Sequence, residues 1–145
     1  MRAADSESEL RKRLGGSLEQ LTARKGIAAM CSFYADQRVD GATIDNDRDM
    51  LLYQWGIDGF NAPELFQISV TRQLNVLGES QPYQLALIFS FPPTDALRKI
   101  GPSNLWCRSP DDLPEFQQFV DTSDAFRAVA DAKADRVELH LGRLG

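Results

Sequence analysis

Two stretches decide the fold: Glu64–Leu74, read ELFQISVTRQL, and Tyr83–Phe91, read YQLALIFSF. In both, apolar and polar residues alternate with a period of two, which places them on opposite faces of a β-strand. The segment between them contains Gly78 and Ser80, which suit the turn of a hairpin. The sequence therefore predicts two adjacent antiparallel strands in the middle of a sheet.

Two further stretches, Met50–Ile57 and Arg136–Leu141, show the same alternation. Asp58–Pro63 contains glycine, asparagine and proline, so it suits a turn between the first two strands. We therefore expect three sequential strands, joined by a fourth at either edge. Ser103–Arg108, read SNLWCR, is interpreted as an irregular link.

Helices are expected in the part of the chain that precedes the first strand. Ser6–Leu14 predicts a short helix, and Ser17 begins the sequence Ser-Leu-Glu-Gln, a capping box typical of a helix start. The second helix has an apolar stripe, made of Ile27, Met30, Cys31 and Tyr34. Gly26 could break this helix, because glycine in a helix interior costs about 1 kcal/mol.

The C-terminal half predicts three more helical segments. Asp95 can cap a short helix, Ser109 can begin a longer one, and Thr122–Asp124 can restart it. Asp111, Asp112 and Glu115 are interpreted as carboxylates that favour the positive end of a helix dipole. The predicted fold class is α+β, with a four-stranded mainly antiparallel sheet, helices packed on one face, and the order α-β-β-β-α-α-β.

Length and charge narrow the classes of function. A chain of 145 residues suits a single α+β domain over residues 1–145, in which we expect residues 1–16 to be loosely packed. The formal net charge of −5 disfavours nucleic acid and anionic membranes as partners and favours a basic one. No apolar run reaches the length of about 20 residues that crosses a bilayer, so we expect a cytoplasmic protein.

The two faces of the predicted sheet differ in character. One is apolar and is expected to face the helices. The other is uncharged across its centre and comprises Met50, Leu52, Gln54, Gln67, Ser69, Thr71, Gln73, Gln84, Ala86, Ile88, Ser90, Glu138 and His140. Because amides and hydroxyls lose water at a smaller cost than charges, we interpret this face as a partner-binding surface, with an ordinary solvated sheet face as the alternative. The partner-binding residues are Gln54, Gln67, Thr71, Gln73 and Gln84.

Arg72 is the one charged residue in the apolar row of its strand. An unpaired guanidinium in a core is costly, so we expect Arg72 at a rim or beside a carboxylate. The candidate carboxylates are Asp49, Asp58 and Glu64. The alternative is a ligand site, in which Arg72 binds an anion beside Tyr53 and Trp55.

Motifs of catalysis and metal binding are scarce. His140 is the only histidine, which excludes a His-rich zinc site. Cys107 is interpreted as a packed side chain, with a catalytic pairing to His140 left open, and no disulfide to Cys31 is expected. Asp45–Asp49 resembles half of a calcium loop but lacks its glycine, so a plain acidic loop is favoured. No catalytic, cofactor or metal residue is predicted.

Trp106 is interpreted as a plug between helix and sheet, with a partner contact as the alternative.

The fragments LLYQWG, TRQL, QLALIF and NLWCRSP, within Asp49–Phe126, resemble those of small, functionally uncharacterised bacterial proteins. In size, acidity and element order the chain is similar to bacterial immunity proteins and to the small acidic chaperones of type III secretion.

The uncharged sheet face motivates the first hypothesis, a non-enzymatic bacterial protein that binds another protein, or a second copy as a homodimer, through that face or an exposed strand edge. One alternative is a small-ligand binder or enzyme with a pocket between sheet and helices that uses Arg72, Tyr53 and Trp55. Another is a structural component of a larger complex.

Overall fold

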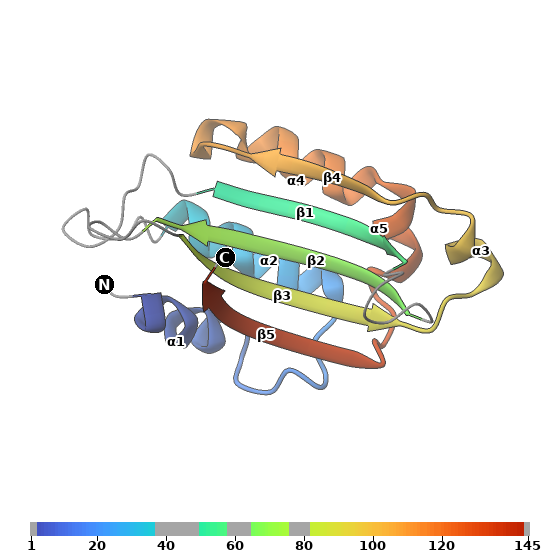
Figure 1. Ribbon diagram of the computed structural model, residues 1–145, viewed down its shortest axis with the longest axis horizontal. Helices are drawn as coiled ribbons and strands as arrows, with labels where there is room; N and C mark the ends of the chain where they lie inside the picture. The colour runs from blue at the N-terminus through green and yellow to red at the C-terminus, as the bar shows by residue number, and fades with distance from the viewer. Residues whose placement is uncertain (1–2, 37–49, 58–64, 76–81, 144–145) are drawn as a thin grey trace.

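A five-stranded antiparallel sheet forms the centre of the computed structural model (Figure 1). The structure describes residues 3–36, 50–57, 65–75 and 82–143. The strands are β1 (Met50–Ile57), β2 (Phe66–Leu74), β3 (Tyr83–Phe91), β4 (Ser103–Cys107) and β5 (Arg136–Arg143). Their order across the sheet is β4-β1-β2-β3-β5, so the sequential meander β1-β2-β3 is extended at both edges.

The chain also forms five α-helices within the described residues, and those that cover the sheet lie on one side of it. The five helices are α1 (Ala3–Arg13), α2 (Ala23–Asp36), α3 (Asp95–Arg98), α4 (Leu113–Thr122) and α5 (Asp124–Val129). In Figure 1 α2, α4 and α5 lie behind the strands, and no helix among the described residues lies in front. The sheet therefore has a helix-covered face and, within the described part of the chain, an open face.

The core fills the helix-covered face. The residues of this face form cross-strand rows, and one row that crosses all five strands consists of Leu105, Tyr53, Val70, Leu87 and Leu139. All of these but Leu105 are buried. The buried stripe of α4, Leu113, Phe116 and Val120, packs on the β4 and β1 end of this row, where Phe116 contacts Tyr53, and α2 packs on β2 and β3. The two-residue alternation of the strands and the apolar stripes of the helices thus bring the apolar residues of both into one layer.

The predicted α+β class and antiparallel sheet are confirmed, but the number of strands is five instead of four. The fifth strand is β4, within the segment expected to be an irregular link. It is short, and Trp106 stands where an alternating strand would carry a polar residue, so the pattern of period two is hidden. The predicted last strand pairs with β3, which fixes the strand order.

The predicted start of α2 at Ser17 is wrong, because the helix begins at Ala23. Thr22 caps it: its Oγ1 accepts a hydrogen bond from the Lys25 N–H at 3.3 Å. Residues 17–22 form turns, one of which is closed by the Leu21 N–H donating to the Leu18 oxygen. Burial of Leu21 in the core holds the chain in this turn, so the later cap is used.

Two other helix starts can be compared with the sequence. The cap of α3 is Thr94, whose Oγ1 accepts from the Leu97 N–H, and not Asp95. The restart at α5 is confirmed, since Ser123 Oγ accepts from the Phe126 N–H at 3.2 Å. In α1, Leu10 is buried. The loose packing of residues 1–16 and the single domain over residues 1–145 stay predictions.

Gly26 lies inside α2, and the break that this glycine could have caused does not occur. A Cβ at this position would lie 2.5 Å from Phe89 Cζ and 2.9 Å from Leu87 Cδ2. Such distances are far below van der Waals contact, so a side chain at position 26 would push α2 away from β3. The glycine therefore lets the helix backbone pack directly on the middle of the sheet.

We predict that Gly26→Ala destabilises the protein by about 1–3 kcal/mol, because overpacking outweighs the gain in helix propensity. Chemical unfolding followed by circular dichroism measures this change. Adding Phe89→Leu to Gly26→Ala should recover part of the loss, since the smaller side chain vacates the contested space. Gly142→Ala, at a glycine with open space around it, is the control and should be close to neutral.

Candidate functional site: the open face of the sheet

The open face consists of the outward residues of all five strands, arranged in cross-strand rows. The first row is Trp106, Leu52, Thr71, Ala86 and His140, and the second is Asn104, Gln54, Ser69, Ile88 and Glu138. On one side of these lie Gly56, Gln67, Ser90 and Arg136, and on the other Met50, Gln73, Gln84 and Gly142. All five predicted partner-binding residues therefore share this face.

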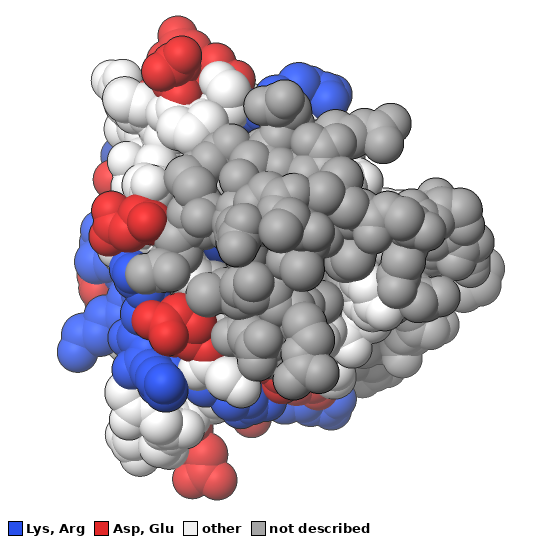
Figure 2. Space-filling view, turned by 90° about the vertical axis from the view of Figure 1, so that its left-hand side faces the viewer, with Lys and Arg blue, Asp and Glu red and all other residues white. Residues whose placement is uncertain are grey.

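The centre of the open face is uncharged. Its charged strand residues, Arg136 and Glu138, lie on β5 at one edge. Elsewhere charge collects with the helices: Figure 2, a view from the end at which α1 lies, shows acidic and basic side chains interspersed toward the helix side. The neutral strip across β1, β2 and β3 is thus a local property of the sheet.

The predicted partner-binding residues differ in how much they project. Gln54 is exposed, and Gln67, Gln73 and Gln84 are half-buried. Thr71 is only 7% exposed, because it sits on the central strand among the side chains of both neighbours. Gln67 Nε2 donates a hydrogen bond to Ser90 Oγ at 3.3 Å, which holds this amide along the sheet.

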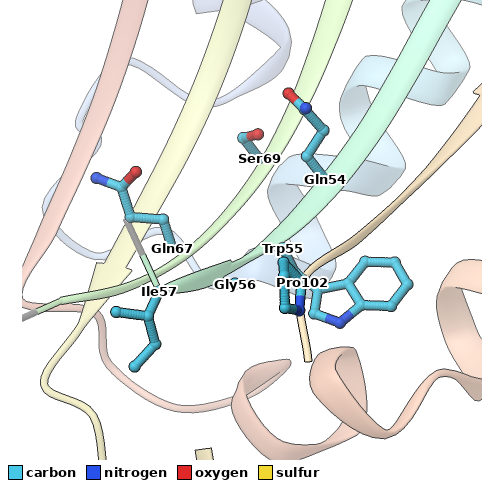
Figure 3. A pocket seen from close by; sticks show the side chains of 7 residues that line it. All are labelled: Gln54, Trp55, Gly56, Ile57, Gln67, Ser69 and Pro102. Atoms are coloured by element: carbon cyan, nitrogen blue, oxygen red, sulfur yellow. The ribbon is translucent and has the colours of Figure 1, made fainter. Parts of the chain in front are cut away.

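A shallow hollow of about 320 Å³ lies at one end of the open face, and we call it the glutamine hollow. It is lined by Gln54, Trp55, Gly56, Ile57, Gln67, Ser69 and Pro102. In Figure 3 the amides of Gln54 and Gln67 and the hydroxyl of Ser69 lie on one side of the strands, with Trp55 and Ile57 on the other. The hollow thus offers hydrogen-bonding groups without charge.

Gly56 creates this hollow. It has no side chain between Gln67 on β2 and the start of β4, and its φ of +148° is one that residues with a side chain rarely adopt. A Cβ there would lie 2.9 Å from Pro102 Cβ. Both the backbone conformation and the close approach of Pro102 therefore require glycine.

We predict that Gly56→Ala costs about 1–3 kcal/mol of stability, since the backbone strain of a non-glycine residue adds to the clash with Pro102. Thermal unfolding measures the loss. Gly56→Ala with Pro102→Gly should recover only part of it, because the second change removes the Cβ of residue 102 from the clash and leaves the backbone strain at position 56. Gly101→Ala, at an unstrained glycine with nothing close by, is the matched control.

The β5 edge of the open face carries a small ionic network. Glu138 Oε2 lies 2.7 Å from His140 Nε2, and Glu138 Oε1 accepts from Arg136 at 2.9 Å. These hydrogen bonds, the one with His140 first, lower the pKa of Glu138 from its ordinary value. The negative charge of Glu138 offsets the positive charge of Arg136 beside it, so the face stays close to neutral.

We predict that His140→Ala raises the pKa of Glu138 toward the ordinary value of about 4.3, as measured by carboxyl carbon NMR. Because the folded-state pKa is lowered, the stabilisation is present above the ordinary pKa and is lost as the pH falls through the lowered one. Arg136→Ala should have the smaller effect. A Glu138 pKa that is unchanged in His140→Ala would contradict the network.

Of the residues predicted to form a ligand site with Arg72, the structure places Trp55 apart, whereas Tyr53 pairs with Val70 on the same face, two residues from Arg72. Arg72 is fully buried, away from any rim, with its Cζ 4.5 Å from the Phe33 ring of α2. Tyr53 and Trp55 pack together at 5.1 Å under α4. Trp55 pairs with Ile68, four residues from Arg72, which is about 13 Å along the strand. The expected carboxylates Asp49, Asp58 and Glu64 lie outside the described residues.

The open question of a Cys107–His140 pair is settled by topology. Cys107 lies on β4 and faces the helices, whereas His140 lies on β5 at the other edge and faces outward. Four interstrand steps of about 4.8 Å separate them, roughly 19 Å in all. Burial raises the pKa of the Cys31 thiol to about 12, so this cysteine is protonated at neutral pH, and neither cysteine forms a disulfide.

Trp106 is not a buried plug, which corrects our sequence interpretation. It is 39% exposed, because its pairing with Leu52 places it on the open face at the β4 edge. Phe119 of α4 is 41% exposed nearby and was missed, since its spacing with Phe116 and Val120 is that of an ordinary buried stripe. Pro102 was missed too, because β4 was not predicted.

No helix in the described ranges is long and apolar enough to cross a membrane. Within those ranges, no three His, Cys, Asp or Glu side chains are grouped as metal ligands. The calcium-like segment Asp45–Asp49 lies outside the described residues. Comparison of the chain with protein-family models, curated proteins and solved structures finds no match.

Proposed function

We propose that this chain is a non-enzymatic, immunity-like or chaperone-like protein that binds another protein through the open face. The observation that carries the proposal is the face itself: cross-strand rows of amide, hydroxyl and small apolar side chains, uncharged from β4 to β3. No described helix covers it (Figure 1).

The physical argument rests on the cost of removing water. A lysine or glutamate buried at an interface needs a partner of opposite charge, whereas amides and hydroxyls can hydrogen-bond to the backbone or side chains of many partners. Leu52 and Ile88 add apolar area that gains by burial. The face can therefore be desolvated at modest cost by a partner whose own surface is polar and uncharged.

The alternative, a small-ligand binder or enzyme that uses Arg72, Tyr53 and Trp55, has less support. Arg72 stacks beneath α2, while Trp55 lies under α4 and lines the glutamine hollow. A ligand small enough for that hollow would contact Trp55 without reaching Arg72. The partner-binding proposal does not require one ligand to contact both Trp55 and Arg72.

The test is a double substitution, Gln67→Lys with Gln84→Lys, which places two charges on the face while long side chains keep their ammonium groups in water. Affinity purification from the native host, quantified by mass spectrometry, should show a partner that the wild type retains and the variant loses at least tenfold. Light scattering on the same samples shows whether the partner is a second copy.

The matched control is Ala96→Lys with Ala132→Lys, which adds the same charge at two exposed positions outside the face. It should retain the partner. Equal recovery of every protein by wild type, variant and control, together with a monomeric wild type, would overturn the proposal.

A further inference from the structure

The two edges of the sheet are protected differently. Within the described residues, β5 pairs with β3 alone and β4 pairs with β1 alone, so each has one unpaired side. The β5 edge carries Arg136, Glu138 and His140, and charges of this kind discourage the addition of another strand. The β4 edge, Ser103–Cys107, carries no charge. It is therefore the edge open to pairing.

A groove runs beside this edge, and we call it the edge groove. It is a hollow of about 290 Å³ lined by Leu105, Trp106, Asp112, Glu115, Phe116 and Phe119. The two large apolar side chains that the described surface leaves exposed, Trp106 and Phe119, both belong to it. Exposed aromatic residues gathered at one point are typical of a binding site.

The groove has an acidic rim. Asp112 and Glu115 are exposed at the start of α4, and Asp112 Oδ2 accepts a hydrogen bond from the Arg108 N–H. The Arg108 guanidinium lies 5.3 Å from the Trp106 ring, which shows that this ring accepts a cation on its face. The rim therefore favours a positively charged side chain beside an apolar one.

We propose that the β4 edge and the edge groove together bind an extended segment of a partner protein, which adds as a sixth strand. In an added strand every second side chain points toward α4. One apolar side chain of the segment then enters the groove between Leu105 and Phe119. A lysine or arginine two residues away meets the carboxylates of Asp112 and Glu115.

This inference rests on the proposed function, because it specifies how the same partner is held, and it uses different residues from the centre of the open face. A second copy of the chain fits the edge less well. Both copies would carry the acidic rim and the net charge of −5, so like charges would meet where the proposed segment supplies opposite ones.

The experiment selects a display library of random peptides, about ten residues long, on the immobilised protein. Enriched peptides should share an apolar residue with lysine or arginine two positions away. Glu115→Lys and Phe119→Gln should each weaken the binding of a selected peptide, measured by fluorescence anisotropy, about tenfold or more. Gln118→Lys, an exposed change on the same helix, is the control and should leave binding nearly unchanged.

Amide hydrogen exchange separates strand addition from contact with the groove alone. The N–H groups within Ser103–Cys107 that point away from β1, which are every second one, should exchange more slowly when the selected peptide is bound, since a sixth strand pairs with them. The same selection on a protein with both Glu115→Lys and Phe119→Gln gives the background. If the wild type enriches no peptides above this background, the inference is wrong. It is also wrong if the bound peptide leaves amide exchange in β4 unchanged. A wild-type dimer that Phe119→Gln dissolves would overturn it too.

The two proposals fail in distinguishable ways. If Gln67→Lys with Gln84→Lys loses the native partner while Glu115→Lys retains it, the open face is the binding surface and the inference about β4 is wrong. If Glu115→Lys loses the partner and the double variant retains it, the edge binds and the face does not.

Discussion

The register between β1, β2 and β3 is the constraint on which the rest of the structure depends. Side chains alternate between faces, so a slip of one residue would carry every apolar side chain of a strand to the open face and its polar side chains under the helices. In β2 such a slip would desolvate Gln67, Ser69 and Gln73 beneath α2. Correct pairing is therefore the same event as formation of both the core and the open face.

Arg72 shows how the helix layer adapts to that register. It is a fully buried cation in an apolar row, between Leu51 and Leu85. The sequence predicted that such a residue must reach a rim or a carboxylate. Within the described residues, α2 places the rings of Phe33 and Tyr34 4.5 Å and 5.7 Å from its Cζ, where the negative faces of aromatic rings attract a guanidinium. The candidate carboxylates lie outside those residues, so a carboxylate partner stays a prediction. The gap left by Gly26 lets α2 lie close to the sheet nearby.

The strands could be predicted from the sequence where the alternation of apolar and polar residues was complete. The candidate site on the open face could be predicted only in part. The bounds of β1 and β3 were read correctly, because an apolar residue recurs at every second position. β4 was missed because Trp106 faces water, an arrangement that only its pairing with Leu52 explains. Gln54 and Gln67 followed from alternation, but the glutamine hollow depends on the φ of Gly56 and on Pro102, which tertiary structure alone brings together.

The open face and the edge groove meet at Trp106. This residue ends the cross-strand row that contains Leu52 and Thr71, and it also lines the groove beside α4. A strand added to β4 would lengthen that row by one residue and bury the exposed indole. The polar face and the aromatic edge are thus parts of one continuous surface. In the proposed complex the strand edge would supply backbone hydrogen bonds and the face would supply uncharged side chains.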